Sequence, residues 1–293
     1  MLIEKVLKKA KKERAEADAQ TVEKPEPEGA AGLEPVEEPP RVTGKGPPAA
    51  ARQRTLELDK EFITCHRCLS EASTPKEIES YKILRTRIHH RMKANHWRTV
   101  MITSPGAGEG KTLTAVNLAI SFAKAYDQTV LLVDCDFRRQ SIHKCLGYAD
   151  SPNLIDHILD QVPLQDTMVR IGGQDLVVIS GERVVMDSAE ILGSPQMMHL
   201  VGEMKNRYKD RIILFDLPPV LYNADSLAFA PWVDGILIVV SAGKTSMKEL
   251  KTALNGLPWE KFLGYAFNRS TISTNGYYKY NYYSTERLKP KNR

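Results

Sequence analysis

The sequence contains 293 residues, with 41 lysines and arginines against 36 aspartates and glutamates, and its formal net charge is +5. This small, scattered excess does not form the concentrated basic surface of a nucleic-acid-binding protein, so no nucleic-acid partner is expected. No apolar run approaches the roughly 20 residues that span a bilayer, and the start of the chain lacks a signal-peptide pattern. We therefore expect a soluble protein that is located in the cytoplasm.

The first sixty residues divide into two segments without a folded core. Residues 1–18 are expected to form a basic amphipathic helix, because apolar side chains recur at helical spacing within residues 2–14. This helix suits a membrane surface or a partner protein, and a fraying terminal helix without a role is an equal alternative. Residues 19–60 are predicted to be a disordered linker, because residues 21–50 hold seven of the 17 prolines and bury too little apolar surface to offset ordering entropy.

A long helix is predicted over residues 74–93. Thr74 and Glu77 have the spacing of a capping box, and a proline stands in the first turn. Ahead of this helix, Cys65 and Cys68 form a C-x-x-C pair. Since no second pair follows at the spacing of a zinc site, reduced cysteines are favoured over a metal site.

From residue 99 onward, short β-branched runs alternate with longer stretches of helical spacing. The predicted strands are residues 99–104, 129–134, 176–180, 211–216, 235–241 and 264–268. The predicted helices are residues 111–125, 188–207 and 246–256. Strands this apolar need cover on both faces, so the pattern predicts a doubly wound α/β fold with a mostly parallel sheet flanked by helices. In such folds ligands bind at the carboxyl ends of the strands.

The first of these strands runs into the segment SPGAGEGKT (104–112) and then into a helix. A strand, a glycine-rich loop and a Lys-Thr pair opening a helix are typical of a P-loop, although a glycine-rich turn that carries a lysine by chance is the competing interpretation. Lys111 would contact the β- and γ-phosphates of a nucleotide, and the Thr112 hydroxyl would ligate Mg²⁺. The generic pattern has a glycine where this chain has Pro105. The nucleotide-binding residues expected from this segment are Gly106, Gly108, Glu109, Gly110, Lys111, Thr112 and Leu113.

Carboxylates follow two other strands. Asp134 and Asp136 end the strand of LLVDCDFRR, and Asp216 ends the strand of IILFDLPP. Buried strands that end in carboxylates make little sense as core, but they suit a metal ion bound to phosphate. The sequence therefore predicts a magnesium–phosphate site at this edge of the sheet.

These three segments resemble the Walker A, Walker A′ and Walker B motifs of the bacterial tyrosine kinases, or BY-kinases. The resemblance extends over about residues 74–283, includes the segment SAEILGSPQM (188–197), and accounts for Pro105, because family members commonly lack the first glycine of the loop. It implies the fold of P-loop NTPases, with ATP and Mg²⁺ as cofactors. The catalytic residues that it implies are Lys111, Asp134, Asp136 and Asp216. The implied metal ligands are Thr112, Asp134 and Asp216, and Asn268 matches a position that often contacts adenine.

The family also implies an oligomer. Glu79 and Arg85 match its E-x-x-R-x-x-R helix, which packs neighbouring subunits into a ring, and Lys82 stands at the middle position in place of arginine. The lysine at the middle position lacks the bidentate fork of arginine, so a weaker ring contact is expected.

Residues 275–293 form a basic tail that is rich in tyrosine. In the family, such a tail is phosphorylated by the adjacent subunit. The implied phosphoacceptors are Tyr277, Tyr278, Tyr280, Tyr282 and Tyr283. An edge strand built from the alternating tyrosines, and an arm that stacks on single-stranded nucleic acid, are the competing interpretations.

The resemblance thus implies that residues 61–274 are the kinase domain of an ATP-dependent tyrosine autokinase that regulates exopolysaccharide or capsule polymerisation or export. A separate membrane-anchored protein, similar to chain-length regulators, would activate it and recruit it to the inner face of the plasma membrane. A positioning or partition ATPase is the first alternative, although those proteins typically carry a signature lysine where this chain has Gly106. A non-enzymatic nucleotide-binding scaffold is the second.

Overall fold

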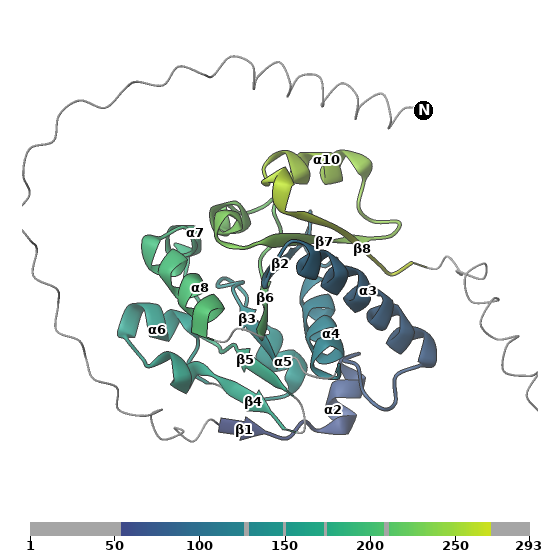
Figure 1. The fold of residues 1–293 in the computed structure, drawn as a ribbon, viewed down its shortest axis with the longest axis horizontal. Helices are drawn as coiled ribbons and strands as arrows, with labels where there is room; N and C mark the ends of the chain where they lie inside the picture. Colours follow the sequence, from purple (N-terminus) through teal and green to yellow (C-terminus); the bar gives the residue numbers. More distant parts are fainter. Residues whose placement is uncertain (1–53, 126–128, 149–150, 173–174, 208–210, 271–293) are drawn as a thin grey trace, which may run out of the picture. The chain divides into compact units, whose positions relative to one another are not determined.

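The computed structural model describes residues 54–125, 129–148, 151–172, 175–207 and 211–270. Over these residues the chain forms one eight-stranded sheet with helices on both faces (Figure 1). The strands are β1 (Arg54–Leu56), β2 (Thr99–Thr103), β3 (Thr129–Asp134), β4 (Val169–Ile171), β5 (Leu176–Ile179), β6 (Arg211–Asp216), β7 (Gly235–Ser241) and β8 (Phe262–Asn268). The α-helices are α2 (Lys60–Cys65), α3 (Pro75–Ala94), α4 (Lys111–Ala123), α5 (Ile142–Leu146), α6 (Leu154–Asp160), α7 (Ser188–Leu192), α8 (Pro195–Arg207), α9 (Asp225–Phe229) and α10 (Met247–Asn255). Short 3₁₀ helices are η1 (Leu164–Thr167), η2 (Ala230–Trp232) and η3 (Trp259–Lys261).

The strand order places the motif-bearing strands side by side in the middle of the sheet. The order is β1-β4-β5-β3-β6-β2-β7-β8, and every pairing is parallel except that between β4 and β5. In the β3–β6 ladder Asp134 lies opposite Asp216, and Ile102 of β2 lies opposite Asp216 on its other side. The carboxyl ends of the three central strands are therefore level, as the doubly wound prediction requires.

Each face of the sheet has its own hydrophobic core, because alternate residues of a strand point to opposite faces. Ile213 and Phe215 of β6 pack with α8 and α10, whereas Ile212 and Leu214 pack with α3 and α4. On β2, Met101 belongs to the same core as Ile213, and Val100 belongs to the same core as Ile212. A sheet covered on both sides explains why the central strands read as unbroken apolar runs.

The structure corrects two boundaries that were expected from the sequence. β1 lies within the stretch assigned to the linker and pairs with β4, so the folded part begins at Arg54 rather than at residue 61. The single helix expected over 188–207 is two helices, because α7 ends at Gly193 and the hydroxyl of Ser194 accepts a hydrogen bond from Met197 N to start α8. The capping box at Thr74 is confirmed.

The remaining linker, the basic helix over residues 1–18 and the tail over 275–293 lie outside the described residues. Within the described part of the chain, no helix combines the length and the apolar character that a bilayer crossing requires.

Candidate active site

The loop between β2 and α4 has the backbone of a phosphate-binding loop. Gly108 and Gly110 adopt φ angles of 71° and 94°, which a residue with a Cβ rarely adopts. At Gly110 a Cβ would also lie 2.1 Å from the side-chain nitrogen of Asn268. Because glycine is the N-cap of α4, no side chain occupies the first amides of the helix. These amides and the positive end of the helix are therefore available to a phosphate.

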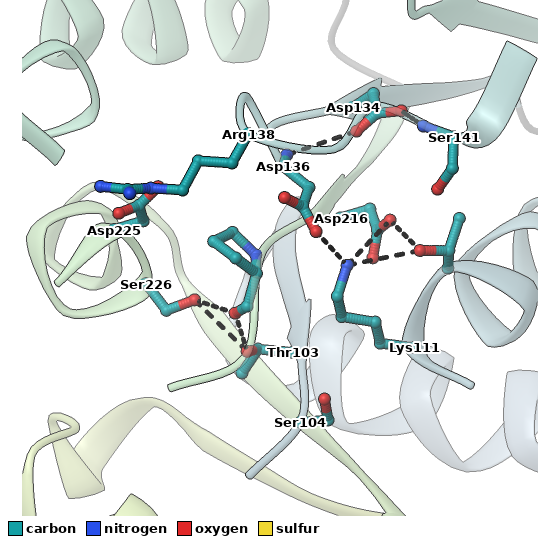
Figure 2. A network of polar contacts seen from close by, with 12 residues as sticks. Thr103, Ser104, Lys111, Asp134, Asp136, Arg138, Ser141, Asp216, Asp225 and Ser226 are labelled. Carbon is teal, nitrogen blue, oxygen red and sulfur yellow. Dashed lines mark hydrogen bonds and ion pairs between the residues drawn. The ribbon is translucent and has the colours of Figure 1, made fainter. Parts of the chain in front are cut away.

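Lys111 lies between two carboxylates at the ends of β3 and β6 (Figure 2). Its Nζ is 2.7 Å from Asp136 Oδ2 and 3.6 Å from Asp216 Oδ2. The Thr112 hydroxyl donates to the same Asp216 oxygen at 2.6 Å. Burial acts to lower the pKa of Lys111, but the attraction of Asp216 and Asp136 outweighs it and raises that pKa above its ordinary value. Lys111 is therefore a cation, and it offsets the charge of the carboxylates around it.

Asp216 has the features of a metal-binding carboxylate. It is fully buried, and burial raises its pKa to about 7 although Lys111 opposes the shift. Its Oδ1 is buried without a hydrogen-bond partner among the described residues, which is costly for a carboxylate. Beside the Thr112 hydroxyl, this oxygen is the hard ligand that Mg²⁺ prefers.

The described residues include no group of three or more His, Cys, Asp or Glu arranged to hold a metal ion alone. Mg²⁺ in phosphoryl-transfer sites is usually bound through one or two carboxylates together with substrate phosphates. The residues present therefore fit an ion that arrives with a nucleotide rather than a resident one.

Asp134 is placed differently from the other two aspartates. Its Oδ2 accepts hydrogen bonds from the backbone of Ser141 and Ile142 at 2.9 and 3.0 Å and from the Ser180 hydroxyl at 2.9 Å. Its Oδ1 accepts from Asp136 N at 3.3 Å. Both oxygens thus hold the turn that carries Asp136. This arrangement favours a positioning role for Asp134, and its predicted contact with a metal stays a prediction.

The loop between β7 and α10 and the end of β8 both donate hydrogen bonds to the P-loop. Lys244 Nζ donates to the carbonyl of Ala107 at 2.6 Å, and the Thr245 hydroxyl donates to Glu109 Oε1 at 2.7 Å. Asn268 Nδ2 donates to the carbonyl of Glu109 at 2.9 Å. Lys244 and Thr245 were not among the site residues expected from the sequence. The signal that marks them is their place directly after an apolar strand of the same sheet.

The other expected residues of the P-loop have structural contacts of their own. The Gly106 carbonyl accepts a hydrogen bond from the Ser104 hydroxyl at 2.7 Å. Glu109 is 3% exposed, and burial raises its pKa. Leu113 packs against the core beneath α4. Their side chains shape the loop, and their predicted contacts with a nucleotide stay predictions.

A polar cluster of the exposed Arg138 with the buried Ser188 and Asp225 adjoins the site and was also missed. Arg138 Nε lies 3.0 Å from the Ser188 hydroxyl. It also lies 3.5 Å from Asp225 Oδ2, and Figure 2 shows these two side chains together. The Ser188 hydroxyl donates to the same Asp225 oxygen at 2.5 Å. These contacts tie the turn after Asp136 to α7 and α9. Ser188 opens the segment SAEILGSPQM (188–197), which carried part of the family resemblance and was the available signal.

The predicted oligomer residues divide into two groups. Glu79 and Lys82 are exposed on α3 and lie 3.9 Å from each other. Arg85 instead donates to the carbonyl of Ser121 at 2.7 Å and so holds the end of α4. A subunit contact through these residues stays a prediction.

The two cysteines of the C-x-x-C pair differ in burial. Cys65 is exposed and Cys68 is buried, with its Sγ 3.5 Å from the carbonyl of Cys145. Burial, with a smaller effect from Cys145, raises the pKa of the Cys68 thiol to about 12. A thiol that resists ionisation is a poor metal ligand.

Known proteins resemble this chain over most of the described part. A family model described as an AAA domain matches residues 97–258. The tyrosine-protein kinase YwqD of Bacillus subtilis is 31% identical over 216 residues, which is 72% of this chain and 89% of that protein. The chain belongs to the bacterial tyrosine kinase family.

Other members of the kinase family differ in length from this chain. The tyrosine-protein kinase Ptk of Acinetobacter johnsonii is 31% identical over 202 residues, 68% of this chain but 27% of that protein. Among solved structures, the BceF tyrosine kinase domain is 28% identical with a TM-score of 0.59, over 65% of this chain and 76% of that one. The VpsO kinase domain is 26% identical with a TM-score of 0.60, and the match covers 67% of this chain and 97% of that one. The P-loop fold and the mostly parallel sheet are thus confirmed.

Proposed function

We propose that this protein is an ATP-dependent protein-tyrosine kinase that phosphorylates the tyrosine cluster of its own C-terminal segment in a neighbouring subunit. The observation that carries the proposal is the convergence of Lys111, Thr112, Asp136 and Asp216 beside a loop shaped for phosphates. Membership of the tyrosine kinase family favours this function over a partition-type ATPase. Five acceptor phenols lie within residues 277–283, a short distance along the chain from the site residue Asn268.

The geometry suggests how Lys111 would control the base. Lys111 Nζ lies 2.7 Å from Asp136 Oδ2, so this carboxylate is engaged. A phosphate bound at the start of α4 would draw the ammonium away and leave Asp136 free to accept the phenol proton. A phenol with an ordinary pKa of about 10 needs such a base at neutral pH.

The reaction transfers the γ-phosphoryl group from ATP to the phenol oxygen. The bond from the γ-phosphorus to the bridging oxygen breaks, a bond to the phenol oxygen forms, Asp136 takes the phenol proton, and ADP leaves. Thr112 and Asp216 would hold Mg²⁺, which would neutralise charge on the β- and γ-phosphates. The amides at the start of α4 would hold the phosphates, and Asp134 would keep Asp136 in place.

The proposal extends to the surroundings of the enzyme. A ring-like oligomer formed through Glu79, Lys82 and Arg85 would bring one subunit's tail to its neighbour's site. A separate membrane-anchored activator would recruit the kinase to the inner face of the membrane. Residues 2–14 would provide a further contact with the membrane surface. The kinase would thereby regulate exopolysaccharide or capsule polymerisation or export. A relative from Staphylococcus aureus named putative tyrosine-protein kinase CapB, 25% identical over 206 residues, supports the kinase part of this proposal.

The test is mass spectrometry of phosphotyrosine after the purified full chain is incubated with ATP and Mg²⁺. We expect phosphate on residues 277–283 in the wild type, none with Lys111→Met, and wild-type labelling with the control Lys124→Met, an exposed lysine just beyond α4. Mixing the Lys111→Met chain with a catalytically intact chain whose five tail tyrosines are phenylalanines tests transfer between subunits. ATP hydrolysis without phosphotyrosine would instead indicate a partition-type ATPase, and labelling of Lys111→Met alone would refute the site.

A further inference from the structure

Among the described residues, the outer edge of β8 is open to another strand from Tyr265 to Asn268, whereas the carbonyl of Leu263 accepts a hydrogen bond from Arg91 Nη1 of α3. β8 is last in the sheet order and pairs with β7 on one side, within the described residues. Figure 1 shows it between α10 on one face and α3 on the other. The carbonyl of Asn268 accepts a hydrogen bond from Ala242 N next to β7, so by the alternation of a parallel strand the peptide groups of Phe267 and Tyr265 turn outward. An open edge of this kind is a template for strand addition.

A row of aromatic side chains follows this edge. It consists of Trp259, Phe262, Tyr265 and Phe267. The first two rings stack with centroids 4.9 Å apart, the next pair meets edge to face at 4.9 Å, and the last pair is 6.3 Å apart. Both ends of the row are open to solvent, since Trp259 is 64% exposed and Phe267 is 68% exposed. A continuous aromatic row with exposed ends is unusual on a protein surface that has no partner.

The chain itself supplies a strand that fits this edge. Eight residues, 269–276, separate the end of β8 from Tyr277, which is a connection long enough for the chain to fold back beside β8. The seven residues from Tyr277 to Tyr283 equal the length of β8. Because the segment is tethered to the strand, its effective concentration at the edge is high.

We propose that residues 277–283 dock antiparallel on the open edge of β8 as a ninth strand, with their tyrosines against the aromatic row. If Tyr277 pairs with Asn268, Tyr278 lies opposite Phe267 and Tyr280 lies opposite Tyr265. Aromatic pairs across neighbouring strands stabilise a sheet. Lys279, which alternates with these tyrosines, projects from the other face of the strand.

Docking would hide the acceptor tyrosines from a kinase site, and this consequence rests on the proposed function. A tyrosine engaged on β8 cannot enter a neighbour's site until the strand detaches. Phosphorylation adds a charge of about −1.5 to −2 and opposes packing against apolar rings. A phosphorylated segment would therefore stay released, and the aromatic row would be uncovered for as long as the phosphate remains.

Amide hydrogen exchange on the full chain tests the docking. With Lys111→Met as the background, so that no phosphate forms, we expect amides of residues 277–283 to exchange at least roughly tenfold more slowly than in the same chain carrying Phe267→Ser. Phe267 is mostly exposed, so its replacement spares the core. The matched control is Leu159→Ser on α6, another exposed apolar residue, which should leave the slow exchange unchanged.

Three outcomes separate the docking from its alternatives. Equal exchange with and without Phe267→Ser overturns the proposal, whether or not the wild type makes phosphotyrosine. Slow exchange that vanishes on dilution also overturns it, because a second copy of the chain would then be the occupant. Slow exchange that is independent of concentration, found together with a wild type that forms no phosphotyrosine with ATP, keeps the docking and refutes only the proposed function.

Discussion

Lys111→Met should destabilise the ligand-free protein as well as abolish phosphotransfer. The lysine is the cation that faces Asp136 and Asp216 inside the site, and its side chain is only 12% exposed. At an effective dielectric constant of about 20, charges 2.7 and 3.6 Å apart attract by about 6 and about 5 kcal/mol. The desolvation of the lysine, several kcal/mol, opposes this attraction. Removal of one partner from a buried pair typically costs about 3–5 kcal/mol.

The pH dependence of this loss has a definite sign. Burial already raises the pKa of Asp216 to about 7 in the folded protein, from an ordinary value of 3.8. Without Lys111 the folded protein would bind this proton still more tightly, whereas the unfolded chain releases it near its ordinary pKa. Stability contributed in this way is fully present below the unfolded pKa and falls as the pH rises through the folded pKa. The variant should therefore lose more stability at pH 8 than at pH 6.

The assay is thermal and urea unfolding of the wild type, of Lys111→Met and of the double variant Lys111→Met/Asp216→Asn. At pH 8 the single variant should melt roughly 10 °C below the wild type, since about 4 kcal/mol in a domain of this size shifts the melting temperature by about 2–4 °C per kcal/mol. The double variant should recover part of the loss without recovering phosphotransfer, because the uncompensated carboxylate has gone. Equal melting temperatures for wild type and Lys111→Met at pH 8 would refute this account of the site.

Two further substitutions test the contacts of the P-loop, and a third tests the hydrogen bonds at the start of β2. Gly110→Ala, which places a methyl group against Asn268 at a φ of 94°, should reduce nucleotide affinity by at least tenfold in a fluorescent-nucleotide titration. Lys244→Ala should weaken the same affinity several-fold through loss of the bond to Ala107, whereas Lys248→Ala on the exposed face of α10 should not. Asp234→Asn should cost about 1–2 kcal/mol in urea unfolding at pH 7. Burial acts to raise the pKa of Asp234, but bonds from Arg98 N and other donors lower it overall, so the effect should shrink as the pH falls below about 4.

The central fold was predictable because its strands are long and buried on both faces. β2, β3, β6 and β7 have five to seven residues, nearly all of them buried, so each reads as an apolar run that a helix cannot mimic at that length. β1 and β4 have three residues each, which is too short for a pattern. Pairing with a neighbour, rather than local propensity, makes them strands.

The candidate site was predictable to the extent that its chemistry lies at strand ends. Lys111, Asp136 and Asp216 could be grouped before the structure because parallel strands end at one edge. The orientation of a carboxylate within that edge could not be predicted, because it depends on donors outside the strand. Asp134 accepts hydrogen bonds from the backbone of Ser141 and from the hydroxyl of Ser180. The hydrogen bond from Lys244 to the P-loop could not be predicted for the same reason.

In the proposed reaction, the contacts of Lys111 would impose an order of events. Asp136 is bonded to Lys111, so it is a poor base until another anion draws the ammonium away. A phosphate bound at the start of α4 is such an anion, whereas a phenol is not charged at neutral pH and cannot compete for Lys111. A tyrosine that reaches the site before ATP would therefore meet an engaged carboxylate. In the proposed reaction the nucleotide would therefore prepare the base for the acceptor, because one lysine would serve both the carboxylate and the phosphate.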